Sequence, residues 1–146
     1  MLKKTVILMS LIPTLAFANL GENRQAAINA WGPPAWQDGN VSLYFSRGLY
    51  IEETYDAADL CQQVIYSEAT PMDQKLTATL DKYNLPSGKP IWTELNNANP
   101  NMRGWKVNGG AYYVMSIQGY LGNNWQSMRS YATAQGVLMT VNRAAK

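Results

Sequence analysis

The chain has 146 residues, 47% of them hydrophobic and 15% charged, a balance typical of a packed globular protein rather than a disordered one. It contains one cysteine and no histidine, with a formal net charge of +2. These counts exclude Ser-His-Asp and Cys-His catalysis, histidine-ligated zinc and an internal disulfide.

Residues 1–18 have the parts of a secretory signal peptide of bacterial type. Two lysines precede an apolar run of about a dozen residues, and residues 16–18 read Ala-Phe-Ala, the pattern of a cleavage site. The run is shorter than the roughly 20 apolar residues that cross a bilayer. We therefore expect cleavage after Ala18, one globular domain at 19–146 and a periplasmic or secreted protein without membrane insertion.

The charges are distributed unevenly along the rest of the chain. Without Lys3 and Lys4, ten basic and ten acidic residues remain, so nothing indicates nucleic-acid binding. Residues 19–81 hold nine acids against three bases, and residues 82–146 hold seven bases against one acid. Either the two parts pack together and neutralise each other, or copies of the chain self-associate head to tail.

Helical patterns dominate the first half of the predicted domain. A short helix is predicted over residues 19–30, ended by Pro33 and Pro34. Residues 40–66 are predicted to be helical as well, with a possible break near Gly48, because polar side chains recur there at the spacing of a helical stripe: Glu52, Asp56, Asp59 and Gln63.

The second half continues the pattern. Residues 70–73, Thr-Pro-Met-Asp, are typical of a helix start, and the helix is expected to end at Asn84. A short helix is predicted from Pro90, and a final one from Asn123 or Asn124 to about Arg143. Residues 111–117 fit a strand or a helix equally well. The sequence thus predicts a mainly α domain of five or six helices, with one short β element near 111–117 left open, and shows no internal repeat.

Carboxylates are the catalytic groups that the composition leaves. A glycoside hydrolase needs two of them about 5 to 10 Å apart. The dense acidic group Glu52, Glu53, Asp56 and Asp59 supplies candidates, and all but Glu53 would share one face of a helix. The same stripe is what the solvated face of any amphipathic helix shows. Glu94, beside Trp92, is another candidate acid, and an ion pair with Lys89 or Lys106 explains it more simply. No calcium-binding loop or cofactor motif is present, so no metal or cofactor is expected.

Aromatic residues are the one compositional excess, with five tryptophans and nine tyrosines. Such rings make rigid contacts at protein interfaces and stack on sugars. Trp31 and Trp36 flank the paired prolines and could be displayed together, or they could fold back onto the core. The candidate binding residues are therefore Trp31, Trp36, Glu52, Asp56, Asp59, Trp92 and Trp105.

The functional prediction is an exported, non-catalytic protein that binds another macromolecule. Inhibitors, immunity proteins, adaptors and secretion-system components all fit this description. The alternative is a cell-wall or glycan-binding protein, with peptidoglycan or a polysaccharide as partner, or a carboxylate-dependent glycan hydrolase. Cys61 is expected to be buried in the core, with an intermolecular disulfide as the alternative.

Overall fold

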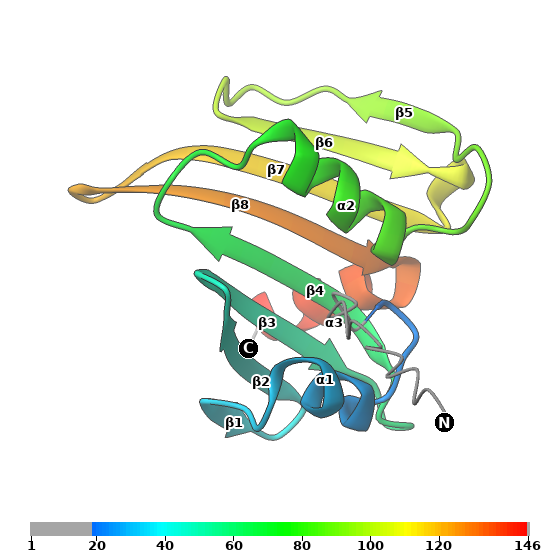
Figure 1. Ribbon diagram of the computed structural model, residues 1–146. Coiled ribbons are helices and arrows are strands. Elements are labelled where there is room, and N and C mark those ends of the chain that lie inside the picture. Colours follow the sequence, from blue (N-terminus) through cyan, green and yellow to red (C-terminus); the bar gives the residue numbers. More distant parts are fainter. Residues whose placement is uncertain (1–18, 146) are drawn as a thin grey trace, which may run out of the picture.

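The computed structural model describes residues 19–145, so the predicted signal peptide lies outside the described residues. Within that range Figure 1 shows eight strands and three α-helices. In chain order they are α1 (Arg24–Trp31), β1 (Trp36–Asp38), β2 (Val41–Ser46), β3 (Leu49–Tyr55), β4 (Cys61–Glu68), α2 (Gln74–Asn84), β5 (Trp92–Leu95), β6 (Met102–Val107), β7 (Tyr112–Leu121), β8 (Asn124–Thr133) and α3 (Ala134–Ala144).

The strands form one antiparallel sheet in the order β1-β2-β3-β4-β8-β7-β6-β5. This order describes the same unit twice. A helix followed by four antiparallel strands makes up each half of the chain, and the two halves join where β4 pairs with β8. The duplication is one of topology, since no repeat is visible in the sequence.

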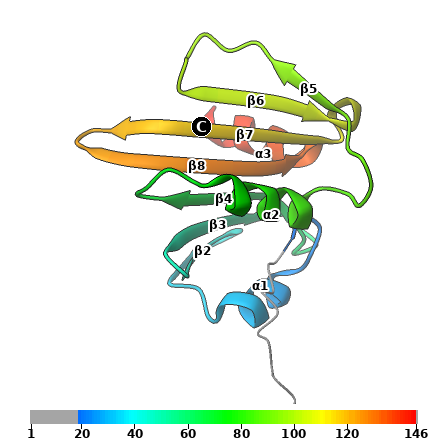
Figure 2. The same ribbon diagram turned by 45° about the horizontal axis from the view of Figure 1, so that its top comes forward.

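The helices divide between the two faces of the sheet. In Figures 1 and 2, α1 and α2 lie on one face, and α3 lies alone on the other. We call these the α1/α2 face and the α3 face. The main core is on the α1/α2 face, where helix residues such as Ala27 and Leu80 pack against strand tyrosines. The fully buried tyrosines of this core are Tyr44, Tyr55, Tyr66 and Tyr131.

The predicted mainly α fold is wrong, and the segment 40–66 shows why. It contains three strands instead of a helix, and burial in β3 alternates from Leu49 to Glu53 as a strand requires. Arg47 and Gly48 both have positive φ, which suits a two-residue hairpin turn between β2 and β3. The acidic residues that suggested a helical stripe do not lie on one helix. Asp56 and Asp59 fall in the next hairpin turn, between β3 and β4.

The other predicted elements had mixed outcomes. The helix predicted over residues 19–30 is confirmed as α1, and the one predicted to start at residues 70–73 is confirmed as α2, although its N-cap is Asp73 rather than Thr70. The helix predicted from Pro90 is wrong, because β5 occupies that segment. Only the end of the last predicted helix is helical, as α3, since residues 124–133 form β8. Of the two possibilities at 111–117, the strand is confirmed as part of β7.

Candidate functional site

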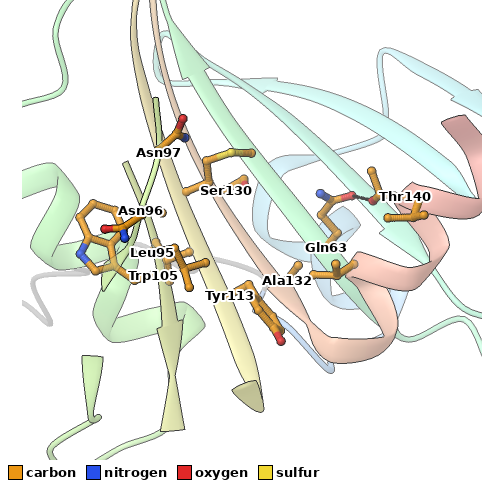
Figure 3. Close-up of a pocket in the computed structure, with 14 residues that line it drawn as sticks. Gln63, Leu95, Asn96, Asn97, Trp105, Tyr113, Ser130, Ala132 and Thr140 are labelled. Atoms are coloured by element: carbon orange, nitrogen blue, oxygen red, sulfur yellow. Dashed lines mark hydrogen bonds between the residues drawn. The ribbon is translucent and has the colours of Figure 1, made fainter. Parts of the chain in front are cut away.

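A groove lies on the α3 face, between α3 and the strands β5 to β7. Its volume is about 350 Å³. Figure 3 shows that it draws on segments far apart in the chain: β4, the end of β5, β7, β8 and α3. We call it the α3 groove. The apolar side chains that line it include Leu95, Tyr113, Met115, Ala132, Val137 and Val141.

Helix α3 is held against β4 by a glycine in its first turn. A Cβ at Gly136 would lie 2.1 Å from the carbonyl oxygen of Gln62, so only glycine lets the helix approach this closely. One turn later, the Thr140 hydroxyl donates a hydrogen bond to Oε1 of Gln63 at 2.9 Å (Figure 3). These contacts hold one side of α3 against β4, and the valines of α3 line the groove.

The groove has an apolar centre and an uncharged polar margin. Leu95 and Met115 are exposed within it. Asn96, Asn97 and Ser130 add hydrogen-bonding groups beside them (Figure 3). No Asp, Glu, Lys or Arg is among the fourteen described residues that line it.

A second apolar area lies on the same face in the N-terminal half. Its residues are Trp36, Phe45 and Tyr50, each more than half exposed, and we call it the aromatic patch. The rings of Phe45 and Tyr50, on paired strands, are 5.0 Å apart. Tyr50 shares a side of β3 with Thr54, whose hydroxyl accepts a hydrogen bond from Arg143 of α3 at 3.3 Å. The patch therefore extends the surface that α3 leaves uncovered.

The predicted acidic group is not brought together on a helix. Glu52 is on the α3 face of β3, whereas the other two acids hold the β3–β4 turn. Asp56 accepts hydrogen bonds from the backbone N–H groups of Ala58 and Leu60 at 2.8 and 3.0 Å. Asp59 forms an ion pair with Arg24 at 3.0 Å. The structure thus gives Asp56 and Asp59 roles in the turn.

Glu94 has a different partner from those expected for it. Its carboxylate accepts two hydrogen bonds from Arg103, at 2.8 and 3.1 Å, rather than pairing with Lys89 or Lys106. These hydrogen bonds lower the pKa of Glu94. A carboxyl with a lowered pKa is poorly suited to act as the general acid of a glycosidase, which needs a raised one.

The predicted tryptophans fall into different environments. Trp31 packs its ring against two core tyrosines, with ring centroids 5.3 and 6.5 Å away. Trp36 stands exposed on the opposite face, so the two rings do not form one surface. Trp92 and Trp105, on paired strands, meet edge to face at 5.9 Å on the α1/α2 face. Of the four, Trp36 belongs to the aromatic patch and Trp105 lines the α3 groove.

Sequence reasoning included Glu53 in the acidic group but missed that its carboxyl group is buried. The Tyr55 hydroxyl donates a hydrogen bond to its Oε2, while Oε1 has no partner among the described residues. Burial raises the pKa of Glu53 to about 7, against a lowering effect of the Tyr55 hydrogen bond. Cys61 lies beside it, and its burial is confirmed. The inward positions of β3 run Leu49, Ile51, Glu53, so recognising the strand would have revealed this residue.

Two further observations concern residues 19–145. No group of three or more Asp, Glu, Cys or His side chains there could hold a metal ion. None of the helices in this range has the length and apolar character needed to span a bilayer.

Comparison with known proteins identifies no family. No protein-family model and no curated protein matches the chain. Among solved structures, a DUF4309 family protein (YjgB) from Bacillus subtilis is similar over 77% of this chain and 78% of that chain. The sequence identity is 15% and the TM-score 0.42. At this degree of similarity the function has to be argued from the site itself.

Proposed function

We propose that this protein is an exported, non-catalytic binding protein that holds an apolar segment of a partner protein in the α3 groove. The observation that carries the proposal is the composition of the groove: apolar and aromatic in the middle, polar at the margin, and free of charged side chains. Protein interfaces share this pattern, because charged residues are depleted at their centres while aromatic residues and Met are enriched.

The surroundings of the groove support the same function. A single helix covers part of the α3 face, and the aromatic patch adds Trp36, Phe45 and Tyr50 to the surface left open. Exposed apolar groups that gather in one area mark interaction sites more often than scattered ones do. Trp and Tyr are also among the interface residues whose replacement by alanine weakens binding most.

The chemistry of the groove defines the part of the partner that would enter it. Without a fixed charge, the groove offers nothing to an acidic or basic side chain, which would lose its hydration there. A partner would therefore insert Leu, Met, Phe or similar side chains. Inhibitors, immunity proteins, adaptors and secretion-system components can all meet this requirement.

The test combines capture with titration of the purified partner. Full-length tagged protein is recovered from the exported fraction of the source cell, and N-terminal sequencing should show a mature chain beginning at Asn19. The partner that copurifies is identified, purified and titrated against wild type and against Met115→Asp, which puts a charge in the groove. A loss of about 30-fold in affinity is expected, the size of a hot-spot effect.

The matched control is Ile91→Asp, because Ile91 is an exposed apolar residue that does not line the groove. It should bind the partner as wild type does, and thermal unfolding should show both variants folded. Equal affinity of Met115→Asp and wild type would overturn the proposal. So would an equal loss in both variants, since that would reflect exposed apolar surface in general.

A further inference from the structure

A second groove lies on the opposite face of the molecule. It is about 600 Å³ in volume and runs between α2 and the strands β6, β7 and β8, on the α1/α2 face. We call it the α2 groove. Three separate segments converge on it: α2, the loop before β6, and β7. Trp105 is the one described lining residue that it shares with the α3 groove, so its function can be tested separately through the other residues.

Exposed or half-buried hydrogen-bonding groups line this groove. Five of its side chains carry an amide or a hydroxyl group, and none of them makes a hydrogen bond to another described residue: Gln74, Thr77, Asn101, Ser116 and Gln118. Amide and hydroxyl side chains can both donate and accept hydrogen bonds. They therefore suit a ligand whose own groups do the same.

The charged residues of the groove are already paired. Asp81 accepts two hydrogen bonds from Nη2 and Nε of Arg129, at 2.8 and 3.0 Å. Arg103 is held by both carboxylate oxygens of Glu94. Each positive charge is thus matched by a carboxylate, and the groove has no surplus cation for a phosphate or a carboxylate ligand.

Aromatic rings complete the lining. Trp105 and Trp125 both line the groove and are half-buried. The guanidinium carbons of Arg103 and Arg129 lie 5.0 and 5.5 Å from the Trp105 ring centroid. This stacking fixes the two arginines beside the free amides and hydroxyls. The ring of Trp125, next to Gln118 in the lining, adds an apolar surface on which the face of a sugar ring can stack.

From these features we propose that the α2 groove binds a neutral oligosaccharide. The groups of such a ligand are hydroxyls that donate and accept, together with C–H faces that pack on aromatic rings. The five free side chains and the tryptophans match these two properties, and the paired charges disfavour an anion. This proposal assigns the glycan-binding alternative raised by the sequence to the α2 groove, which Trp105 and Trp125 line, instead of to Trp31 and Trp36.

The experiment is titration calorimetry of the full chain against neutral oligosaccharides of hexose and N-acetylhexosamine, with inorganic phosphate and oligogalacturonate as anionic probes. At least one neutral oligosaccharide should bind. Asn101→Ala and Gln118→Ala should each weaken that binding about three- to tenfold, the effect of losing one or two hydrogen bonds. The control Gln135→Ala, an exposed glutamine of α3 outside the groove, should not change it.

Two results would overturn the inference. One is the absence of heat for every neutral oligosaccharide at millimolar concentration. The other is tighter binding of phosphate or oligogalacturonate than of any neutral sugar. Met115→Asp separates this site from the proposed protein interface, because it should leave oligosaccharide binding unchanged while Gln118→Ala leaves partner binding unchanged.

Discussion

The two halves of the molecule share one topology but differ in how closely the helix packs on its strands. In the N-terminal half, α1 lies directly on its strands, with Trp31 packed against Tyr44 and Tyr66, and the space beneath the helix is filled. In the C-terminal half, α2 buries Leu80 in the core and also pairs Asp81 with Arg129 of β8, and a groove remains beside it. With the exception of Gln63, all residues that line the two grooves come from the C-terminal half. The comparison teaches that both halves contribute to the core, whereas the two grooves are formed mainly by the C-terminal half.

Each half also buries one carboxyl or guanidinium group among the described residues, and the two groups differ in their partners. Arg129 is 7% exposed and fully paired with Asp81. Glu53 is 1% exposed, and its main partner is the neutral hydroxyl of Tyr55. A buried charge is tolerated where it has a counterion; without one, the group takes up a proton. The C-terminal half therefore keeps an ion pair, and the N-terminal half keeps a neutral acid at moderate pH.

The largest expected effect comes from breaking the ion pair. Asp81→Ala leaves the buried guanidinium of Arg129 without its counterion and should lower the free energy of unfolding by about 3 to 5 kcal/mol. Chemical denaturation measures this change. Glu94→Ala, which breaks an exposed arginine pair on the same face, serves as the control and should leave the midpoint unchanged. The double variant Asp81→Ala/Arg129→Met should regain most of the loss, and its failure to do so would show that the charge is not the cause.

Glu53→Gln is the matching test in the N-terminal half. Because burial raises the pKa of Glu53 to about 7 in the folded state, the folded protein binds a proton more tightly than the unfolded chain does. The contribution of Glu53 to the free energy of unfolding is therefore fully present below about pH 4.5. It decreases by about 3 kcal/mol as the pH rises to about 7. Glutamine cannot ionise, so the free energy of unfolding of the variant should rise relative to that of wild type between pH 5 and pH 8. Unfolding curves of both proteins across this range should converge at the acidic end, and parallel curves would contradict the prediction.

A smaller effect is expected from Gly136→Ala, which tests how the α3 groove is built. The added Cβ must push α3 away from the carbonyl of Gln62, at a cost of about 2 kcal/mol. Gly104→Ala provides the control, since a Cβ there would meet its neighbours at 3.9 Å, an ordinary contact. Denaturation midpoints of the two variants should differ clearly. Partner binding should also weaken in Gly136→Ala, because α3 forms one wall of the groove; Gly104 lines the same groove, so Gly104→Ala serves as a control for stability alone.

The elements that the sequence predicted correctly have local signals that need no partner strand. Asp73 caps α2, and Leu76 and Leu80 follow at the spacing of one helical face. The hairpins have local signals too, such as Arg47-Gly48 between β2 and β3, but these were interpreted as a break within a helix. Short segments rich in aromatic residues satisfy both periodicities, and pairing with other strands decided between them.

The candidate sites were harder to predict for a related reason. Trp105 was selected from the sequence and does line the α2 groove. The α3 groove, in contrast, combines Gln63, Leu95, Met115 and Val141, which are far apart in the chain. Only the order of strands in the sheet brings them together, and an incorrect fold class hides that order. Residues that meet through tertiary pairing carry no common signature in their own segments.

The pairing of β4 with β8 has a consequence for the order of events during synthesis. Residues 63–68 pair with residues 127–132, so β4 has one neighbour, β3, until the chain has been built past β8. During that interval a strand bound for the middle of the sheet presents an unpaired edge, which can recruit other chains. A nascent or truncated chain ending before Asn124 should therefore be far more prone to aggregate than the full one. The strand that protects the N-terminal half is among the last to be made.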